Sequence, residues 1–217
     1  MSEQISSVML VDDHPLLRKG LKQLLALEDE LEVIAEASNG QDAIKLAAEL
    51  DPDLIILDLN MQGMDGLETL KRMRDEGVTS RIVMLTVSDA DEDIVKAISN
   101  GADGYLLKDT DPEVLLDQIK KALEGKMVLS EAITQVLATA LRRPQAKTPA
   151  ELNSLTNREY EILHLIAKGM SNKVIARELN ISDGTVKVHV KHLLKKLGLR
   201  SRVEAAVWMV NQQGVKL

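Results

Sequence analysis

The sequence predicts an α/β domain, built as a doubly wound five-stranded parallel sheet, followed by an all-α domain of four helices. Short apolar runs and amphipathic stretches alternate five times in the front half. This order is typical of parallel strands with helices on both faces. The last third of the chain carries only helical patterns, and 217 residues are enough for two domains.

The five expected strands are short, continuously apolar and bounded by turn residues, as buried parallel strands are. We expect them at 8–11, 31–35, 54–57, 82–86 and 104–107. Helices are expected at 15–27, 41–49, 67–74, 91–100 and 112–124.

A helix and a linker are expected between the two domains. Residues 130–141 predict the helix, and residues 142–154, with two prolines and no apolar period, predict the linker. We therefore divide the chain into a first domain at 1–125, a linker with one helix at 126–149 and a second domain at 150–217.

The second domain is expected to hold four helices, at 157–168, 172–179, 183–197 and 202–213. Thr156 with Glu159, and Ser201 with Glu204, have the spacing of a capping box at two of the helix starts. Four short helices of this kind predict a small bundle.

Charge is distributed unevenly along the chain. Residues 1–130 contain 27 acidic and 13 basic residues, a net charge of −14, whereas residues 150–217 contain 6 and 11, a net charge of +5. A basic tail is a candidate for binding nucleic acid. Cys is absent, which excludes disulfides and thiolate metal sites. No apolar run approaches the roughly 20 residues that cross a bilayer, and the polar start lacks a signal-peptide pattern, so we expect a cytoplasmic protein without membrane insertion.

Polar side chains occur at the ends of four expected strands. Asp12 and Asp13 follow the first strand, Asp58 the third and Lys108 the fifth, and Thr86 ends the fourth. The carboxyl ends of parallel strands share one edge of the sheet, so these side chains are expected to converge. Clustered carboxylates repel unless a cation lies among them, and oxygen ligands without a Cys or a nearby His favour Mg²⁺. Beside such an ion a carboxylate can accept a phosphoryl group, which Lys108 and Thr86 would contact.

This set of residues resembles the site of response-regulator receiver domains, a family with the sheet order 2-1-3-4-5. The resemblance implies that Asp58 is the phospho-acceptor. It implies a Mg²⁺ site made of Asp12, Asp13, Asp58 and the backbone carbonyl of Asn60. It also implies that Thr86 and Tyr105 form a switch pair, in which the hydroxyl moves toward the phosphoryl group and the ring turns inward. One departure is Gln62, which stands where the family usually has proline and loosens the loop after Asp58.

A basic helix is expected at 183–197. Its apolar residues fall on one face, namely Val186, Val190, Leu193, Leu194 and Leu197. The opposite side carries Lys191, His192, Lys195 and Val188, with Lys187 on the shoulder. An exposed valine in a basic face suits contact with a thymine methyl group in a major groove. The alternative is a solvated charged face.

The tail resembles the LuxR-type four-helix DNA-binding domain through Leu155-Thr156-Asn157-Arg158-Glu159, Gly169, Asn172-Lys173, Ile175-Ala176 and Thr185-Val186-Lys187-Val188-His189. The resemblance implies that Lys187, Val188 and Lys191 read bases. Thr185, Asn172 and Lys173 would hold phosphates, and Lys195 would add to the basic face. The last helix carries a stripe of Val203, Ala206, Val207 and Val210. It either dimerises on DNA, as in the family, or only closes the small core.

The two resemblances cover nearly the whole chain, and segments 59–61, 85–90 and 106–109 are similar to the NarL/NarP group of nitrate/nitrite response regulators. They imply a phosphorylation-activated transcriptional regulator of a two-component system, not an enzyme. The implied partners are promoter DNA, a sensor histidine kinase and a second copy of the chain, with RNA polymerase as a further candidate. We expect the unphosphorylated acidic domain to cover the basic helix, and phosphorylation to release it.

Three alternatives stay open. An Mg²⁺-dependent aspartyl phosphohydrolase usually has a second carboxylate two positions after the nucleophile, where this chain has Asn60. A nucleotide-binding module would need a glycine-rich loop or a P-loop after the first strand, and neither is present. A DNA-binding protein whose first domain only dimerises, without control by phosphate, is the third alternative.

Overall fold

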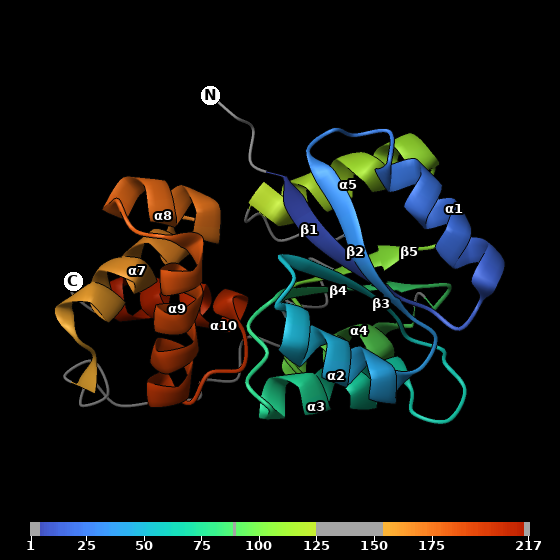
Figure 1. Cartoon of the computed structure of the whole chain (residues 1–217). Helices are drawn as coiled ribbons and strands as arrows, with labels where there is room; N and C mark the ends of the chain where they lie inside the picture. The colour runs from blue at the N-terminus through green and yellow to red at the C-terminus, as the bar shows by residue number, and fades with distance from the viewer. Residues whose placement is uncertain (1–4, 89, 125–153, 215–217) are drawn as a thin grey trace.

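The computed structural model describes residues 5–88, 90–124 and 154–214. These residues form an α/β domain and a helical domain, which lie side by side (Figure 1). The helix expected at 130–141 and the linker expected at 126–149 lie outside the described residues. Within the described ranges, every helix is too short or too polar to cross a membrane.

A five-stranded parallel sheet forms the centre of the α/β domain. Its strands are β1 (Ser6–Val11), β2 (Leu31–Ala37), β3 (Leu54–Asp58), β4 (Arg81–Thr86) and β5 (Gly104–Leu107). The order β2-β1-β3-β4-β5 confirms the expected topology. β2 runs two residues further than the expected 31–35, because its end still pairs with β1 up to Val11.

Five helices cover the two faces of this sheet (Figure 1). They are α1 (Pro15–Leu25), α2 (Gly40–Leu50), α3 (Gly66–Asp75), α4 (Asp91–Ser99) and α5 (Pro112–Glu124). Helices α1 and α5 pack on one face, and α2, α3 and α4 on the other. Each strand has apolar side chains on both faces. In β1, Val8 and Leu10 contact the α1 and α5 side, whereas Met9 and Val11 contact the opposite core.

The helical domain contains α7 (Asn157–Ala167), α8 (Asn172–Leu179), α9 (Asp183–Leu197) and α10 (Arg202–Gly214), as the sequence predicts. The expected capping box at α7 is confirmed, with Thr156 and Glu159 each bonding the other's backbone. At α10 only half of the box forms. The Glu204 backbone N–H donates to the Ser201 hydroxyl, but the Glu204 carboxylate accepts from the backbone of Arg200 instead.

Candidate functional site

Acidic and basic side chains meet at the carboxyl edge of the sheet. The Nζ of Lys108 lies 2.9 Å from an oxygen of Asp12 and 2.9 Å from an oxygen of Asp58. Both carboxylates are almost fully buried, and Asp58 is only 1% exposed. β1, β3 and β5 run parallel, so their ends deliver these residues to one place. A buried carboxylate pair of this kind is tolerated only with a cation beside it.

The electrostatics of the cluster are unbalanced. Burial raises the pKa of Asp58 more than the adjacent Lys108 ammonium group lowers it, and the charge of Asp12 adds to the rise. Donor atoms of Asp12, Asp13, His14 and Asp58 lie within 4.8 Å of one another. Three carboxylates therefore face one ammonium group, and their oxygen atoms fit a hard divalent cation.

The expectation that no histidine lies near this cluster is wrong. The Nδ1 of His14 lies 2.8 Å from Asp13 Oδ1 and 3.4 Å from Asp12 Oδ1. The signal was present in the sequence, because His14 directly follows the two aspartates and stands at the N-cap of α1. Its side chain is 69% exposed, so it lies at the rim of the cluster rather than among the buried oxygens.

The expected switch residues lie next to the cluster and share one partner. Thr86 is fully buried, and its Oγ1 accepts hydrogen bonds from the Ser88 backbone N–H at 3.1 Å and from the Asn60 amide at 3.5 Å. The hydroxyl of Tyr105 donates to the carbonyl of Ser88 at 2.9 Å. The Tyr105 ring is fully buried in the core, so it already faces inward. Ser88, which links the two side chains, was not predicted.

The loop after Asp58 is held against the cluster by its own backbone. The Asn60 N–H donates to Asp58 at 3.3 Å, and the Gln62 N–H donates to Asp13 at 2.9 Å. A proline at the position of Gln62 could not donate this bond, so the looseness expected from Gln62 is offset. Gly66 allows the close approach of α3, because a Cβ there would lie 2.1 Å from the carbonyl oxygen of Asp58.

The basic helix α9 has the two faces that its sequence predicts. All five residues of the predicted apolar face are buried. Lys191, His192 and Lys195 are exposed, and Val188 is 53% exposed. The helix begins at the Ser182 cap, after a turn in which Asn180 adopts a left-handed conformation with φ of 52°. This short turn joins α8 to α9 as in a helix-turn-helix unit.

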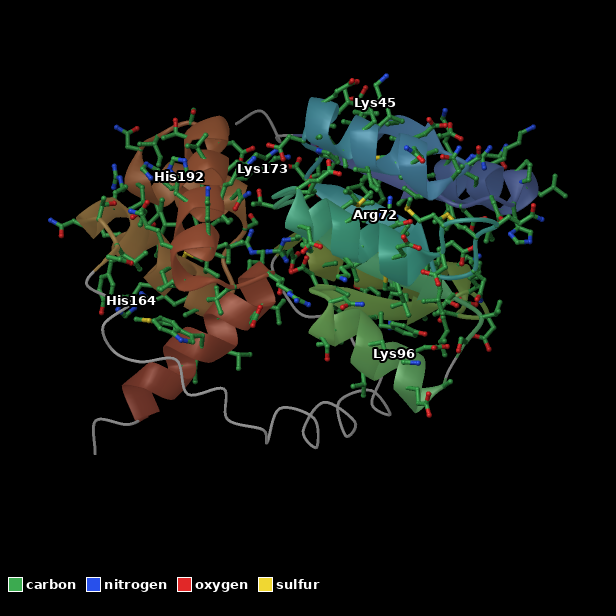
Figure 2. The ribbon with its side chains drawn as sticks, turned by 90° about the horizontal axis from the view of Figure 1, so that it is seen from below. Lys45, Arg72, Lys96, His164, Lys173 and His192 are labelled. Carbon is green, nitrogen blue, oxygen red and sulfur yellow. The ribbon has the colours of Figure 1, made fainter. Side chains whose placement is uncertain are left out.

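The expected phosphate contacts differ in their availability. Thr185 is exposed, with its hydroxyl 2.7 Å from that of Ser182. Asn172 accepts a hydrogen bond from Arg202 at 2.9 Å. Lys173 points into the boundary between the domains (Figure 2), where its Nζ lies 3.0 Å from Asp53 Oδ2. The same ammonium group donates to the carbonyl of Ile5 and to the hydroxyl of Ser6.

The α/β domain also engages α9 directly. The Nζ of Lys187 donates to the carbonyl of Asp51 at 2.6 Å and lies 3.5 Å from a carboxylate oxygen of each of Asp51 and Asp53. Burial alone would raise the pKa of Asp53, but the Ser7 backbone N–H and the two lysines lower it. Arg200 adds a hydrogen bond to the carbonyl of Ser99 at 3.3 Å. Lys173 and Lys187, two of the lysines predicted to contact DNA, therefore pair with acidic residues of the α/β domain. Their partners, Asp51 and Asp53, were not singled out in the sequence.

Comparison with known proteins assigns each part of the chain to a family. Residues 8–120 match the response regulator receiver domain, and residues 153–209 match the bacterial regulatory proteins of the luxR family. The chain is similar to the nitrate/nitrite response regulator protein NarL of Escherichia coli (strain K12), with 55% identity over 208 residues and 96% of each chain covered. Nitrate/nitrite response regulator protein NarP of the same strain is 52% identical over 209 residues, with the same coverage. A crystal structure of response regulator ChrA from a heme-sensing two component system has a TM-score of 0.51 and 34% identity, covering 96% of this chain and 98% of that chain.

Proposed function

Because the chain belongs to the response regulators that join a receiver domain to a LuxR-type DNA-binding domain, we propose that it is a transcriptional regulator switched by phosphorylation of Asp58. Its similarity to NarL and NarP supports a role in the nitrate/nitrite response. The proposal divides the chain at 1–125, 126–149 and 150–217. The observation that carries it is the position of Lys187, a residue of the basic helix whose ammonium group is bound by the receiver.

Phosphorylation would occur at the buried carboxylate of Asp58. One of its oxygens attacks the phosphorus of a phosphodonor, the bond to the donor's leaving group breaks, and an acyl phosphate forms on Asp58. Asp12, Asp13, Asp58 and the backbone carbonyl of Asn60 would hold Mg²⁺. This ion would offset the negative charge that gathers there during transfer. The Nζ of Lys108, which lies 2.9 Å from Oδ2 of Asp58, would pair with the phosphoryl oxygens once they are in place.

The hydroxyl of Thr86 is the group that would report phosphorylation to the rest of the receiver. In this structure its Oγ1 accepts from Ser88. Turning the hydroxyl to donate to a phosphoryl oxygen would break that bond, and Ser88 also holds the hydroxyl of Tyr105 and, through its own hydroxyl, Asp93 of α4. We therefore propose that the signal leaves the site through the segment between β4 and α4.

Release of the helical domain would expose its DNA-binding groups. Lys173 pairs with Asp53, and Lys187 pairs with both Asp51 and Asp53. Neither lysine can keep these partners while it contacts DNA. On DNA we assign base contacts to Lys187, Val188 and Lys191, and phosphate contacts to Thr185, Asn172 and Lys173, with Lys195 beside them. The opposite net charges of the two parts of the chain, −14 and +5, favour the closed state before phosphorylation.

The remaining partners follow from the same assignment. A membrane sensor histidine kinase would supply the phosphoryl group to this chain in the cytoplasm, and RNA polymerase is a candidate partner at the promoter. For a homodimer on DNA we propose α10. Its residues Val203, Ala206 and Val207 are only partly buried, and Val210 is 56% exposed, so this stripe is available to a second copy.

Phosphodonor-dependent DNA binding tests the proposal. The full chain would be treated with acetyl phosphate and Mg²⁺, and binding to promoter DNA measured by fluorescence anisotropy. We expect the mass of one phosphoryl group on the wild type, none on Asp58→Ala, and tighter DNA binding only in the wild type. Equal DNA affinity with and without acetyl phosphate, in a chain shown to be phosphorylated, would favour a regulator that phosphate does not control. Turnover of a small phosphomonoester would favour the phosphohydrolase.

A further inference from the structure

A cavity of about 240 Å³ lies between the receiver and the DNA-binding domain. Its receiver wall includes Ser80 and Arg81 at the start of β4, and its opposite wall includes the first turn of α8 and Arg202 of α10. One water molecule occupies about 30 Å³ in the liquid, so the cavity has room for an ion of several heavy atoms. The proposed function uses the lysines at its edge but leaves the cavity itself without a role.

Two buried donors in the wall of this cavity have no hydrogen-bond partner. They are the hydroxyl of Ser80, a residue that is 5% exposed, and Nη2 of Arg81, which is 6% exposed. The other end of the Arg81 guanidinium group donates to the carbonyl of Ala122. Buried polar groups are nearly always hydrogen-bonded, and an unmet donor costs about 1–3 kcal/mol. An acceptor in the cavity could therefore satisfy either group.

Basic side chains outnumber acidic ones around the same space. The lining contains Arg81, Lys120, Lys173, Arg177, Lys187 and Arg202, against Glu30, Asp51, Asp53 and Glu124. Arg202 is buried and donates only to neutral acceptors, the amide of Asn172 and the carbonyl of Met170. Among the described residues, no carboxylate forms an ion pair with Arg81 or Arg202. Burial, and then the charge of Arg81, lowers the pKa of Arg202 well below its ordinary value, and the charges of Asp103 and Asp183 offset only part of this effect. The two arginines repel each other across the domain boundary, and an anion bound between them would offset that repulsion.

The first turn of α8 adds backbone donors to this wall. Ser171, Asn172 and Lys173 line the cavity, and α8 begins at Ser171. The first turn of an α-helix and the positive end of its dipole favour an anion at this position. Asn172 and Lys173 are also residues to which we assign DNA phosphate contacts, so an anion in the cavity would use groups that DNA requires.

We propose that this cavity binds a tetrahedral oxyanion, such as phosphate or sulfate, between Ser80 and Arg81 of the receiver and the α8 start and Arg202 of the DNA-binding domain. The bound ion bridges the two domains and stabilises the closed state, so it opposes DNA binding. The effect on DNA binding rests on the proposed function, in which the closed state is the inactive one. The binding of the ion does not.

Calorimetric titration of the full chain with inorganic phosphate, without Mg²⁺ and at constant ionic strength, tests the site. We expect one phosphate per chain. Ser80→Ala should weaken binding at least threefold, and this variant should fold because the Ser80 hydroxyl has no partner to lose. Arg81→Gln should weaken it at least tenfold. Arg72→Gln, an exposed arginine of α3 outside the cavity, is the matched control and should bind as the wild type does.

Anisotropy with promoter DNA gives the second readout. At equal ionic strength, replacing chloride by phosphate should weaken DNA binding by the wild type and by Arg72→Gln, and should do so less in Ser80→Ala. Absence of saturable binding, or equal binding by the wild type and Ser80→Ala, would overturn the proposal. Asp58→Ala separates the two proposals: it should keep phosphate binding and lose the response to acetyl phosphate. If the wild type did not bind phosphate in the cavity but still responded to acetyl phosphate, the cavity proposal would fail and the proposed function would stand.

Discussion

The Nζ of Lys187 lies 3.5 Å from Oδ1 of Asp53, across the boundary between the two domains. The lysine belongs to α9, and the aspartate precedes β3, the strand that ends in Asp58. Asp58, the proposed phospho-acceptor, and Asp53, which pairs with Lys187 of the basic helix, therefore lie at opposite ends of one strand. In the proposed function, this strand would connect phosphorylation of Asp58 to the availability of Lys187.

Asp53→Asn should weaken the closed state. The amide retains the size of the carboxylate but loses its charge toward Lys173 and Lys187. We expect the unphosphorylated variant to bind promoter DNA about tenfold more tightly than the wild type, which corresponds to about 1.4 kcal/mol. Glu49→Gln, which neutralises an exposed acid on α2, is the matched control. Anisotropy at low ionic strength measures both, and equal affinities for the two variants would contradict the assignment of Asp53.

The Asp53 contacts also predict a dependence of stability on pH. The pKa of Asp53 is lowered from its ordinary value of 3.8, so the folded state favours the charged form. Its stabilising contribution is complete above that value and is lost as the pH falls through the lower folded pKa. The difference in free energy of unfolding between the wild type and Asp53→Asn should be constant from pH 7 to 5 and shrink below pH 3.8. Urea unfolding across this range measures it, and a difference that grows on acidification would have the wrong sign.

Lys108→Ala should leave two buried carboxylates without their cation. We expect a loss of about 3 kcal/mol in the free energy of unfolding at pH 7. The pKa of Asp58, already raised by burial, should rise further, so the folded state would favour the protonated form. The loss should therefore diminish as the pH is lowered from 7 to 5, when the carboxyl group takes up a proton. Chemical denaturation at both pH values checks this. Lys96→Ala, on the exposed side of α4, is the control.

Val188→Ala should reduce sequence-specific DNA binding without affecting folding. The side chain is 53% exposed, so little packing is lost. Removing the methyl groups that would contact a thymine should cost about 1 kcal/mol, or about fivefold in affinity for the specific site. Binding to unrelated DNA should be unchanged, because it depends on the lysines. Val114→Ala, at a similarly exposed position on α5, is the control, and the two affinities would be compared on specific and scrambled duplexes.

Much of the fold and of the acidic site could be predicted because both depend on local patterns. An apolar run in the sequence predicts each buried strand. Because the strands are parallel, the residues that follow them lie at the same carboxyl edge of the sheet. Asp12, Asp58 and Lys108 converge for that reason. The amphipathic pattern of α9 likewise predicts which of its residues are buried.

Contacts that depend on how the two domains meet could not be predicted. Asp51 and Asp53 look like ordinary turn residues before a strand, and only the docked helical domain gives them the partners Lys173 of α8 and Lys187 of α9. A buried ion pair inside the receiver could not be predicted either: Nη2 of Arg74 lies 2.7 Å from Oδ2 of Asp103. Arg74 belongs to α3 and Asp103 directly precedes β5, and no periodic pattern marks a buried charge.

The distance between the two domains tests the central claim most directly. The chain has no cysteine, so Lys45→Cys on α2 and His192→Cys on α9, both exposed and both labelled in Figure 2, allow specific attachment of two spin labels. The distance between the labels would be measured by pulsed electron–electron double resonance before and after treatment with acetyl phosphate and Mg²⁺, with Asp58→Ala as the control. We predict one short distance before phosphorylation, and a longer, broader distribution afterwards in the chain that retains Asp58. An unchanged short distance in fully phosphorylated protein would contradict the release of Lys187.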